Sequence, residues 1–478
     1  MAVLLWLPVL VPAVMGALIT WRHDDAFARL VPVGVAVVIL VCGIALVAKG
    51  QVTTSWVLRA DAPASYVLLC VGAVAVVALW GGLTSTPLGG RSEALICAFL
   101  AAMSLAVLSD NLGVMWVAVE ATTIATAFLV GHAGTRGATE AAWKYVVLGS
   151  VGVAIAFLGI VLIYASSRIG GSPTLSWVAL TSAGPTLSPA LARAGVALAV
   201  LGFATKAGLA PMHSWLPDAH SQAPAPVSGL MSGVLLSVAM YAILRIQAVG
   251  AAHIGVGLVH GLLIAFGLLS LAVAALLTLT QRDYKRLLAY SSIEHMGVIA
   301  LGVGSGTSLG LIAALLHMLG HGLVKAAMFV LAGRLVNITG SSRIADVTGL
   351  LKRRPDLGWP WLAGSAALLG FPPFVTFFTE VAILVALTQA GLWWAAAGAA
   401  LLLLVAFIGI VRQVLGMAIG APDLQPVAGD HAVIDDPASR FHTVPVAIAL
   451  VSAAAASFLA LALVPILGAA ATALGVLR

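Results

Sequence analysis

The run TSLGLIAALLHMLGHGLVKAAMFVL, residues 307–331, decides how this sequence must fold. It is long and apolar enough to cross a bilayer as a helix, yet it carries His317, His321 and Lys325 at four-residue spacing. Residues i, i+4 and i+8 of a helix lie along one side of it. We therefore expect a membrane-spanning helix with three titratable side chains on one face.

The whole chain shares this apolar character. Of its 478 residues, 62% are hydrophobic and only 8% are charged, and the mean hydropathy is +1.12. This composition excludes a water-soluble globular protein and predicts an all-α polytopic membrane protein with about fourteen spans. The first run lacks the basic flank and cleavage site of a signal peptide, so we expect it to be retained as a span. The predicted spans are 2–20, 30–49, 64–83, 93–109, 112–132, 141–166, 188–211, 227–247, 253–279, 286–305, 307–331, 360–390, 391–415 and 443–472.

Two of these spans are interrupted beside a charged residue. In LGFATKAGLAPMHSWLPDAH (201–220), Gly208 and Pro211 follow Lys206, and in LLGFPPFVTFFTE (368–380) a glycine and two prolines precede Glu380. Paired interrupted helices are typical of transporters built from inverted repeats, with the ion site near the bilayer midplane. Kinks that serve only packing are the alternative. We expect broken helices at the seventh and twelfth spans.

Charge placement indicates the orientation of the chain and limits its partners. The loops after odd-numbered spans hold most of the Lys and Arg, which predicts that both termini face away from the cytoplasm, in a bacterial plasma membrane. This bias accounts for the net charge of +6 and gives no reason to expect a nucleic-acid partner. Cys42, Cys70 and Cys97 are isolated, so we expect no iron-sulfur cluster, zinc site or disulfide frame.

Three basic residues remain within the predicted spans once the loops are counted: Lys144, Lys206 and Lys325. Glu120 and Glu380 are acidic groups in equally apolar surroundings. Each ionised side chain at the bilayer centre costs about 3 kcal/mol, so it needs a partner, water or a function. Bridging between helices is the simpler explanation for one such group. Several groups that can each hold or pass a proton favour a relay.

Three segments carry a resemblance to a known family: 204–236 (ATKAGLAPMHSWLPDAHSQAPAPVSGLMSGVLL), 282–297 (RDYKRLLAYSSIEHMG) and 317–333 (HMLGHGLVKAAMFVLAG). They resemble the antiporter-like membrane subunits of respiratory complex I, and the related subunits of membrane-bound nickel-iron hydrogenases and multi-subunit sodium/proton antiporters. The SSIEHMG form looks most similar to component F of hydrogenase 4. The resemblance covers most of the chain, and no lateral helix is expected after the fourteenth span.

The resemblance implies a function for each intramembrane group. It implies a proton relay formed by six residues: Glu120, Lys206, His317, His321, Lys325 and Glu380. Lys144 resembles a sixth-span position but is also placed to reach the membrane surface. Ser237 stands where many relatives have a lysine, and we expect a water on its hydroxyl to bridge that step.

Lesser candidates keep two readings. Glu294 and His295 form either a proton uptake point or a polar collar. For His213, Asp218 and His220, around Pro217, we favour helix capping over chemistry.

The expected organisation is an N-terminal three-helix segment (1–92), a first antiporter-like repeat (93–250), a second (251–416), and a polar loop with a C-terminal helix (417–478). The predicted function is proton translocation in a redox-driven complex, a hydrogenase or a complex I-like oxidoreductase. A subunit of a sodium/proton antiporter and a scaffold without transport are the alternatives. The expected partners are other membrane subunits, a peripheral redox arm, protons or sodium, and lipid. We expect no cofactor, no metal and no redox active site in this chain.

Overall fold

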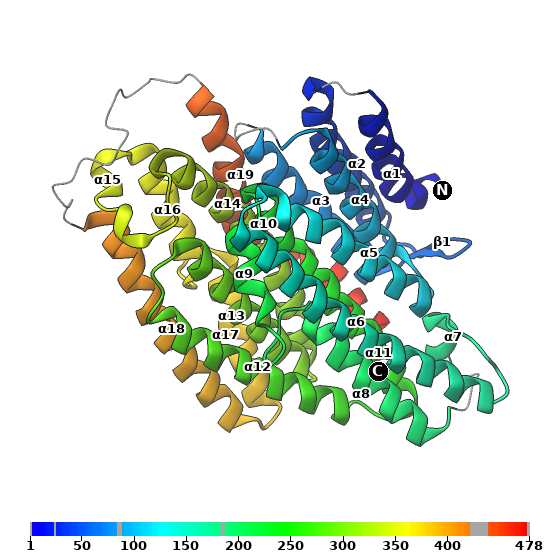
Figure 1. The fold of residues 1–478 in the computed structure, drawn as a ribbon. Helices are drawn as coiled ribbons and strands as arrows, with labels where there is room; N and C mark the ends of the chain where they lie inside the picture. The colour runs from blue at the N-terminus through cyan, green and yellow to red at the C-terminus, as the bar shows by residue number, and fades with distance from the viewer. Residues whose placement is uncertain (1, 23–24, 84–87, 183–186, 421–437, 476–478) are drawn as a thin grey trace.

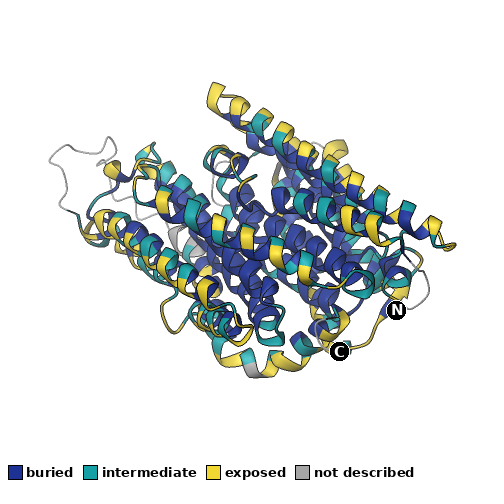
Figure 2. Ribbon diagram, turned by 90° about the horizontal axis from the view of Figure 1, so that it is seen from below, coloured by how far each residue is buried: buried dark blue, intermediate teal, exposed yellow. Residues whose placement is uncertain are grey.

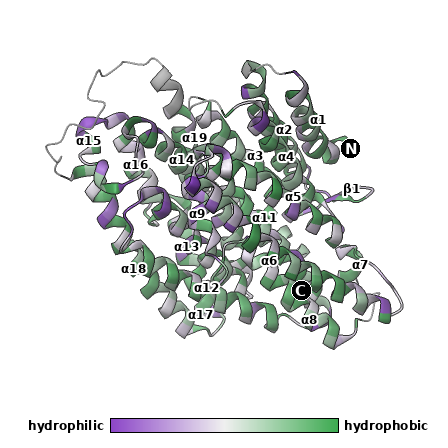
Figure 3. Ribbon diagram, in the orientation of Figure 1, coloured by the Kyte–Doolittle hydropathy of each residue, from purple (hydrophilic) through white to green (hydrophobic). Residues whose placement is uncertain are grey.

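The computed structural model describes residues 2–22, 25–83, 88–182, 187–420 and 438–475. Within these ranges the chain is almost entirely helical (Figure 1). Thirteen helices are long and apolar enough to cross a membrane. The ribbon is mostly hydrophobic, with hydrophilic stretches mainly near helix ends and loops (Figure 3). The all-α polytopic fold predicted from the sequence is confirmed.

The elements follow one another with short connections. The N-terminal part holds α1 (Val3–Arg22), α2 (Asp25–Lys49), the hairpin β1 (Thr53–Ser55) and β2 (Leu58–Ala60), and α3 (Ala62–Gly82). The next part holds α4 (Gly90–Leu108), α5 (Leu112–Val130), η1 (Gly131–Ala133), α6 (Arg136–Ile169), α7 (Trp177–Thr181), α8 (Pro189–Lys206), α9 (Trp215–Gln222), α10 (Ala225–Leu230), the π-helical turn η2 (Met231–Leu235) and α11 (Leu236–His253). Then come α12 (Gly257–Thr278), α13 (Tyr284–Gly304), α14 (Ser308–Thr339), η3 (Ile344–Asp346), α15 (Leu350–Arg353), α16 (Pro355–Leu368), α17 (Val375–Gln389), α18 (Trp393–Ile419) and α19 (Ala438–Ala473).

The spans differ from the predicted ones mainly at their ends. Helices α6 and α14 run several residues beyond the predicted spans, and the span predicted at 360–390 is divided into α16 and α17. The hairpin and the short helices α7, α9 and α15 were not predicted. Asp423, Asp430, Asp435 and Asp436 of the predicted polar loop lie outside the described residues.

Both expected breaks are present and have the same local structure. Helix α8 ends at Lys206 and α16 ends at Leu368. In each case a glycine with positive φ follows, Gly208 at 72° and Gly370 at 64°. The next amide reaches back to a carbonyl within the helix, from Leu209 to Ala204 and from Phe371 to Ala366. The chain thus stops each helix by a glycine turn of the kind that ends many helices.

Gly208 carries a testable consequence. A Cβ at this position would lie 2.4 Å from Leu216 Cδ1, and the φ of 72° is unfavourable for a residue with a side chain. We expect Gly208→Ala to lower the unfolding free energy by about 1–2 kcal/mol. Thermal unfolding in detergent measures the change, with Gly257→Ala as the control, since a Cβ there meets no atom within 4 Å. Equal stability of both variants would contradict the strained turn.

Two sets of helices pack in the same way. In the first, α4 packs on α5, α5 on α6, and α6 on the broken pair α8 and α9. In the second, α12 packs on α13, α13 on α14, and α14 on the broken pair α16 and α17. Each set closes with a further helix, α11 or α18. The repeat architecture expected from the paired breaks is therefore present, while the boundaries at 93, 250 and 416 stay predictions.

The centre of the molecule is formed by α14 and the segment from α10 to α11. The most apolar stretches of both are completely buried, whereas α1 and α18 are largely exposed. Figure 2 shows the same contrast between the buried interior and the outer helix faces. Exposed apolar residues such as Phe128, Leu158, Leu404 and Ile408 cover those outer faces, as lipid or another membrane subunit requires. The titratable stripe predicted at 317–325 therefore lies in the protein interior.

Candidate functional site

Lys206 lies at the end of α8 and is completely buried. Its ammonium donates to the hydroxyls of Thr123 on α5 at 2.7 Å and Tyr145 on α6 at 2.6 Å. The ammonium also lies 4.5 Å from the centre of the Tyr145 ring and 6.0 Å from that of Trp215. Three helices thus solvate a charge that apolar surroundings alone would exclude.

Glu120 on α5 lies close to Lys206 without touching it. Its carboxylate accepts from Ser150 at 2.7 Å and from Thr123 at 3.3 Å. The Thr123 hydroxyl accepts from Lys206 and donates to Glu120, so one hydroxyl joins the two charges. The direct pair that we inferred from the sequence is replaced by this bridge. The sequence analysis missed Thr123, Tyr145 and Ser150, because isolated hydroxyls in an apolar run carry no distinctive signal.

The bridge predicts a specific transport defect. Thr123→Val removes the hydroxyl and leaves the Lys206 ammonium with one hydrogen bond fewer in a buried site. Hydrogen bonds to charged groups are worth about 1.5–3 kcal/mol, so we expect proton translocation to fall roughly tenfold or more. Proton uptake by reconstituted vesicles measures it. Thr122→Val is the matched control, because that hydroxyl bonds only the Val119 carbonyl of its own helix; equal losses in both variants would contradict the bridge.

The stripe on α14 faces α13. Lys325 is completely buried and donates to the Ser291 hydroxyl and, at 2.7 Å, to the Leu288 carbonyl. Four residues further along α13, His295 lies between the two histidines of the stripe. Its ring centre is 5.1 Å from that of His317 and 5.0 Å from that of His321. The three side chains of the stripe therefore meet one face of a single neighbouring helix.

The histidine cluster continues to the second broken helix. His295 Nδ1 lies 2.9 Å from His317 Nε2, and His317 Nδ1 lies 2.8 Å from the Thr379 hydroxyl on α17. Glu380, the next residue, brings a carboxylate oxygen to 3.9 Å from His295 Nδ1. The glycine turn after α16 makes room for this carboxylate, because a Cβ at Gly370 would lie 2.4 Å from its Oε2.

Glu294 and Glu380 line one cavity together with apolar residues of α16 and α18. Glu294 is 5% exposed, and its Oε2 has no hydrogen-bond partner among the described residues. It lies within electrostatic range of Lys325 and Glu380. Glu294 and His295 thus sit in the interior beside the titratable stripe, in the middle of α13.

His220 occupies the space between the two halves of the site. It is completely buried, its ring lies 6.2 Å from Trp215 and 5.7 Å from Phe329, and it is within electrostatic range of Lys325 and His321. Trp215 in turn contacts Lys206. Nδ1 of His220 lies 2.9 Å from the Leu216 carbonyl, and Nε2 has no partner among the described residues. The capping function that we favoured for His220 does not describe this position.

The two halves place different chemistry at equivalent positions. Counted from the N-caps Asn111 and Asp283, Thr123 on α5 corresponds to His295 on α13. Counted from the N-caps Thr135 and Thr307, Tyr145 on α6 corresponds to His317 on α14. The hydroxyls that surround Lys206 in the first half are thus histidines in the second.

Two other predicted residues lie away from this row. Lys144 is partly exposed and pairs with Glu140 at 2.6 Å and with Asp218 at 3.3 Å, and Arg286 also binds Asp218 at 2.5 Å. Asp218 therefore joins ion pairs between helices, and the capping function that we favoured for it is wrong. Ser237 is buried, and its hydroxyl donates to the Gly233 carbonyl of η2 at 3.4 Å.

The expectation of three basic residues within the spans was too low. Lys285, assigned to a loop, lies in the first turn of α13, buried, and donates to the Ser221 and Ala223 carbonyls at the end of α9. Arg245 on α11 is completely buried against Asp61. Both were counted with the loops because they lie near predicted span ends, where burial cannot be read from sequence.

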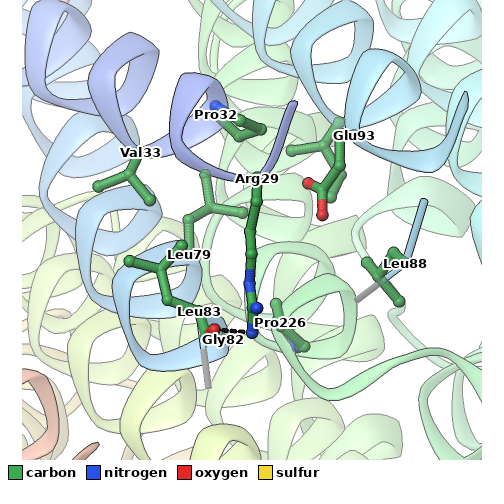
Figure 4. Close-up of a pocket in the computed structure, with 10 residues that line it drawn as sticks. Arg29, Pro32, Val33, Leu79, Gly82, Leu83, Leu88, Glu93 and Pro226 are labelled. Carbon is green, nitrogen blue, oxygen red and sulfur yellow. Dashed lines mark hydrogen bonds between the residues drawn. The ribbon is translucent and has the colours of Figure 1, made fainter. Parts of the chain in front are cut away.

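A second pocket lies between α2, α3 and the start of α10 (Figure 4). Arg29 crosses it and donates to the Leu83 carbonyl, while the Glu93 carboxylate points in from α4. The remaining lining residues are apolar or glycine. None of the residues predicted for the relay lines this pocket, so it is separate from the row described above.

Residues 109–407, more than half of the chain, match the family described as NADH:quinone oxidoreductase/Mrp antiporter, transmembrane. The chain belongs to this family. The matched region includes all the residues of the row from Glu120 to Glu380. The resemblance read from the three segments is thereby confirmed, and the protein is an integral membrane protein of the antiporter-like type.

Individual relatives agree with the family. The chain is 43% identical to the hydrogenase-4 component F homolog of Methylacidiphilum infernorum over 290 residues, 60% of this chain and 61% of that protein. It thus spans about three-fifths of that relative. It is 29% identical to the D-type subunit of the Na(+)/H(+) antiporter of Alkalihalophilus pseudofirmus over 398 residues, 80% of each chain. A chain of the Mrp complex from Dietzia has the same fold, with a TM-score of 0.86 and 22% identity over 99% of this chain and 98% of that chain.

Proposed function

We propose that this chain translocates protons as the antiporter-like subunit of a redox-driven membrane complex, either a membrane-bound hydrogenase or a complex I-like oxidoreductase. The observation that carries the proposal is the buried row that runs from Glu120 through Thr123, Lys206 and His220 to Lys325. It continues through the histidine cluster to Glu380. The similarity to a hydrogenase-4 component F homolog favours a redox-driven complex.

The row is suited to protons more than to metal cations such as sodium. Its members are ammonium, imidazole, hydroxyl and carboxyl groups, each of which binds or passes a proton. A hard cation prefers a cage of oxygen atoms and is repelled by an ammonium. Lys206 and Lys325 each occupy a position where sodium would need oxygen ligands.

The energy required sets what the row must do. Moving a proton against about 150–200 mV requires roughly 3.5–4.6 kcal/mol. Because one pKa unit corresponds to about 1.4 kcal/mol, a relay group must change its proton affinity by roughly three units between uptake and release. We propose that movement of Lys206 relative to the Thr123 bridge supplies this change at Glu120, since it removes or restores a nearby positive charge.

We further propose that the protein lies in a bacterial plasma membrane with both termini outside the cytoplasm, following the distribution of Lys and Arg. Its partners are other membrane subunits and a peripheral redox arm. A subunit of a multi-subunit sodium/proton antiporter is the second candidate, favoured by the similarity to the Alkalihalophilus antiporter protein.

Purification of the tagged chain from its native membrane in mild detergent, followed by mass spectrometry, distinguishes the two candidates. We expect a nickel-iron or quinone-reducing arm to come with it. Recovery of other membrane subunits without any redox protein would contradict the redox-driven assignment and support the antiporter.

A further inference from the structure

The cluster at the end of the row has the ligands of a transition-metal site. His295, His317 and Glu380 each present one ligand atom, and these three atoms all lie within 4.8 Å of one another. His295 Nδ1 is 2.9 Å from His317 Nε2 and 3.9 Å from Glu380 Oε1. Ligand atoms of a tetrahedral zinc ion with bonds of about 2.0–2.1 Å lie roughly 3.3 Å apart, between these two distances.

The hydrogen bonds around His317 leave a lone pair directed at His295. The Thr379 hydroxyl donates to the Val375 carbonyl at 2.9 Å, so it accepts from His317 Nδ1. Neutral His317 therefore carries its proton on Nδ1 and a lone pair on Nε2. Two imidazole nitrogens 2.9 Å apart need a cation between them, which is either a shared proton or a metal ion. A histidine ligand held through its second nitrogen is the usual arrangement in metal sites.

Unpartnered polar atoms point to a ligand at the same place. His295 Nε2 and Glu294 Oε2 are buried, and neither has a hydrogen-bond partner among the described residues. Glu294 lines the same cavity as Glu380, so it offers a further carboxylate beside the three ligands. The cavity extends to α18, where Leu404 is 56% exposed.

We propose that His295, His317 and Glu380 bind a divalent first-row transition ion, with zinc the best fit, and that this ion stops the relay by replacing the proton shared between the two imidazoles. Two imidazoles and one carboxylate with an open fourth position are a common zinc ligand set. Magnesium and calcium are excluded as good fits because they require oxygen ligands. The inhibition rests on the proposed function, whereas binding of the ion does not.

The test is a titration of the purified complex with zinc sulfate alone, followed by competition with a chelating dye. We expect saturable binding, weakened at least tenfold in both His317→Gln and Glu380→Gln. His253→Gln is the matched control, because its ring bonds the Leu180 carbonyl away from the cluster. Thr379→Val keeps all three ligands and removes the bond that orients His317, so roughly tenfold weaker binding is expected there.

X-ray absorption at the zinc edge gives an independent measurement. Nitrogen and oxygen ligands at about 2.0–2.1 Å support the site. Sulfur ligands from Cys42, Cys70 or Cys97, absent binding, or equal affinity in wild type and both ligand variants would overturn it. If zinc binds at this cluster but leaves proton translocation unchanged, the metal site stands and the proposed relay is contradicted.

Discussion

Glu120→Gln abolishes proton translocation while electron transfer in the partner subunits continues. Glutamine has the size of glutamate and keeps polar contact with Ser150 and Thr123, whose hydroxyls bond the carboxylate at 2.7 and 3.3 Å. It cannot bind and release a proton, so the link from Glu120 to Lys206 is lost. We expect the number of protons moved per electron to fall more than tenfold, as expected when a proton-transfer group is removed.

Inverted membrane vesicles measure both quantities in one sample, with a pH-sensitive dye for proton uptake and the consumption of electron donor for redox turnover. Glu140→Gln is the control, because Glu140 is also an acid near a lysine but is exposed at 53%. An unchanged proton yield in the Glu120 variant would contradict its place in the relay. Loss of electron transfer as well would indicate a defect in assembly.

Arg245→Met should cause the largest loss of stability. The Arg245 guanidinium is completely buried, binds both oxygens of Asp61 at 2.8 and 2.5 Å, and stacks 3.9 Å from the Trp177 ring. Its Nε also donates to Tyr241 at 2.8 Å. Removal of one member of a buried pair leaves an uncompensated charge, and we expect a loss of about 3–5 kcal/mol.

The double variant separates the pair from its surroundings. Because replacing both members by neutral groups removes the unpaired charge, Arg245→Met with Asp61→Asn should recover most of the stability lost in Arg245→Met. Thermal unfolding in detergent, with assembly checked by size-exclusion chromatography, measures the three variants. Additive losses in the double variant would contradict a coupled pair.

Asp61 also predicts a pH dependence of stability. Burial alone would raise the pKa of its carboxyl, but the charge and hydrogen bonds of Arg245, the Ala64 amide and the charge of Arg59 lower the pKa below its usual value. A carboxyl with a lowered folded-state pKa stabilises the fold above its unfolded value of about 3.9, and that contribution is lost as pH falls through the folded value. The gap in stability between wild type and Asp61→Asn should therefore be constant from neutral pH to about pH 5 and shrink below about pH 4. A gap that does not change with pH would contradict this assignment.

The sequence predicts the parts of this fold that depend on long apolar runs and on strong local breaks. The spans, the breaks near Gly208 and Gly370, and the burial of Lys206 and Lys325 all follow from that local pattern. The pattern works because lipid forces every span to satisfy its own backbone as a helix.

Features that depend on how helices face each other could not be predicted from the sequence. Thr123, Tyr145 and His220 acquire their positions only when α5, α6 and α9 meet around Lys206. The contact between His295 and Glu380 depends on the packing of α13 against α17. Hydroxyls and single histidines in apolar runs satisfy their own helix as often as they serve a partner, so spacing alone does not separate the two uses.

A comparison of the two ends of the row tests the central claim most directly. Glu120→Gln, Glu380→Gln and the double variant are assembled into the native complex, and protons moved per electron are measured in the same vesicles. If one continuous relay connects Glu120 to Glu380, each single variant already reduces the yield to background and the double variant reduces it no further. If each single variant instead keeps about half of the yield and only the double variant abolishes it, two independent routes exist and the single relay is contradicted.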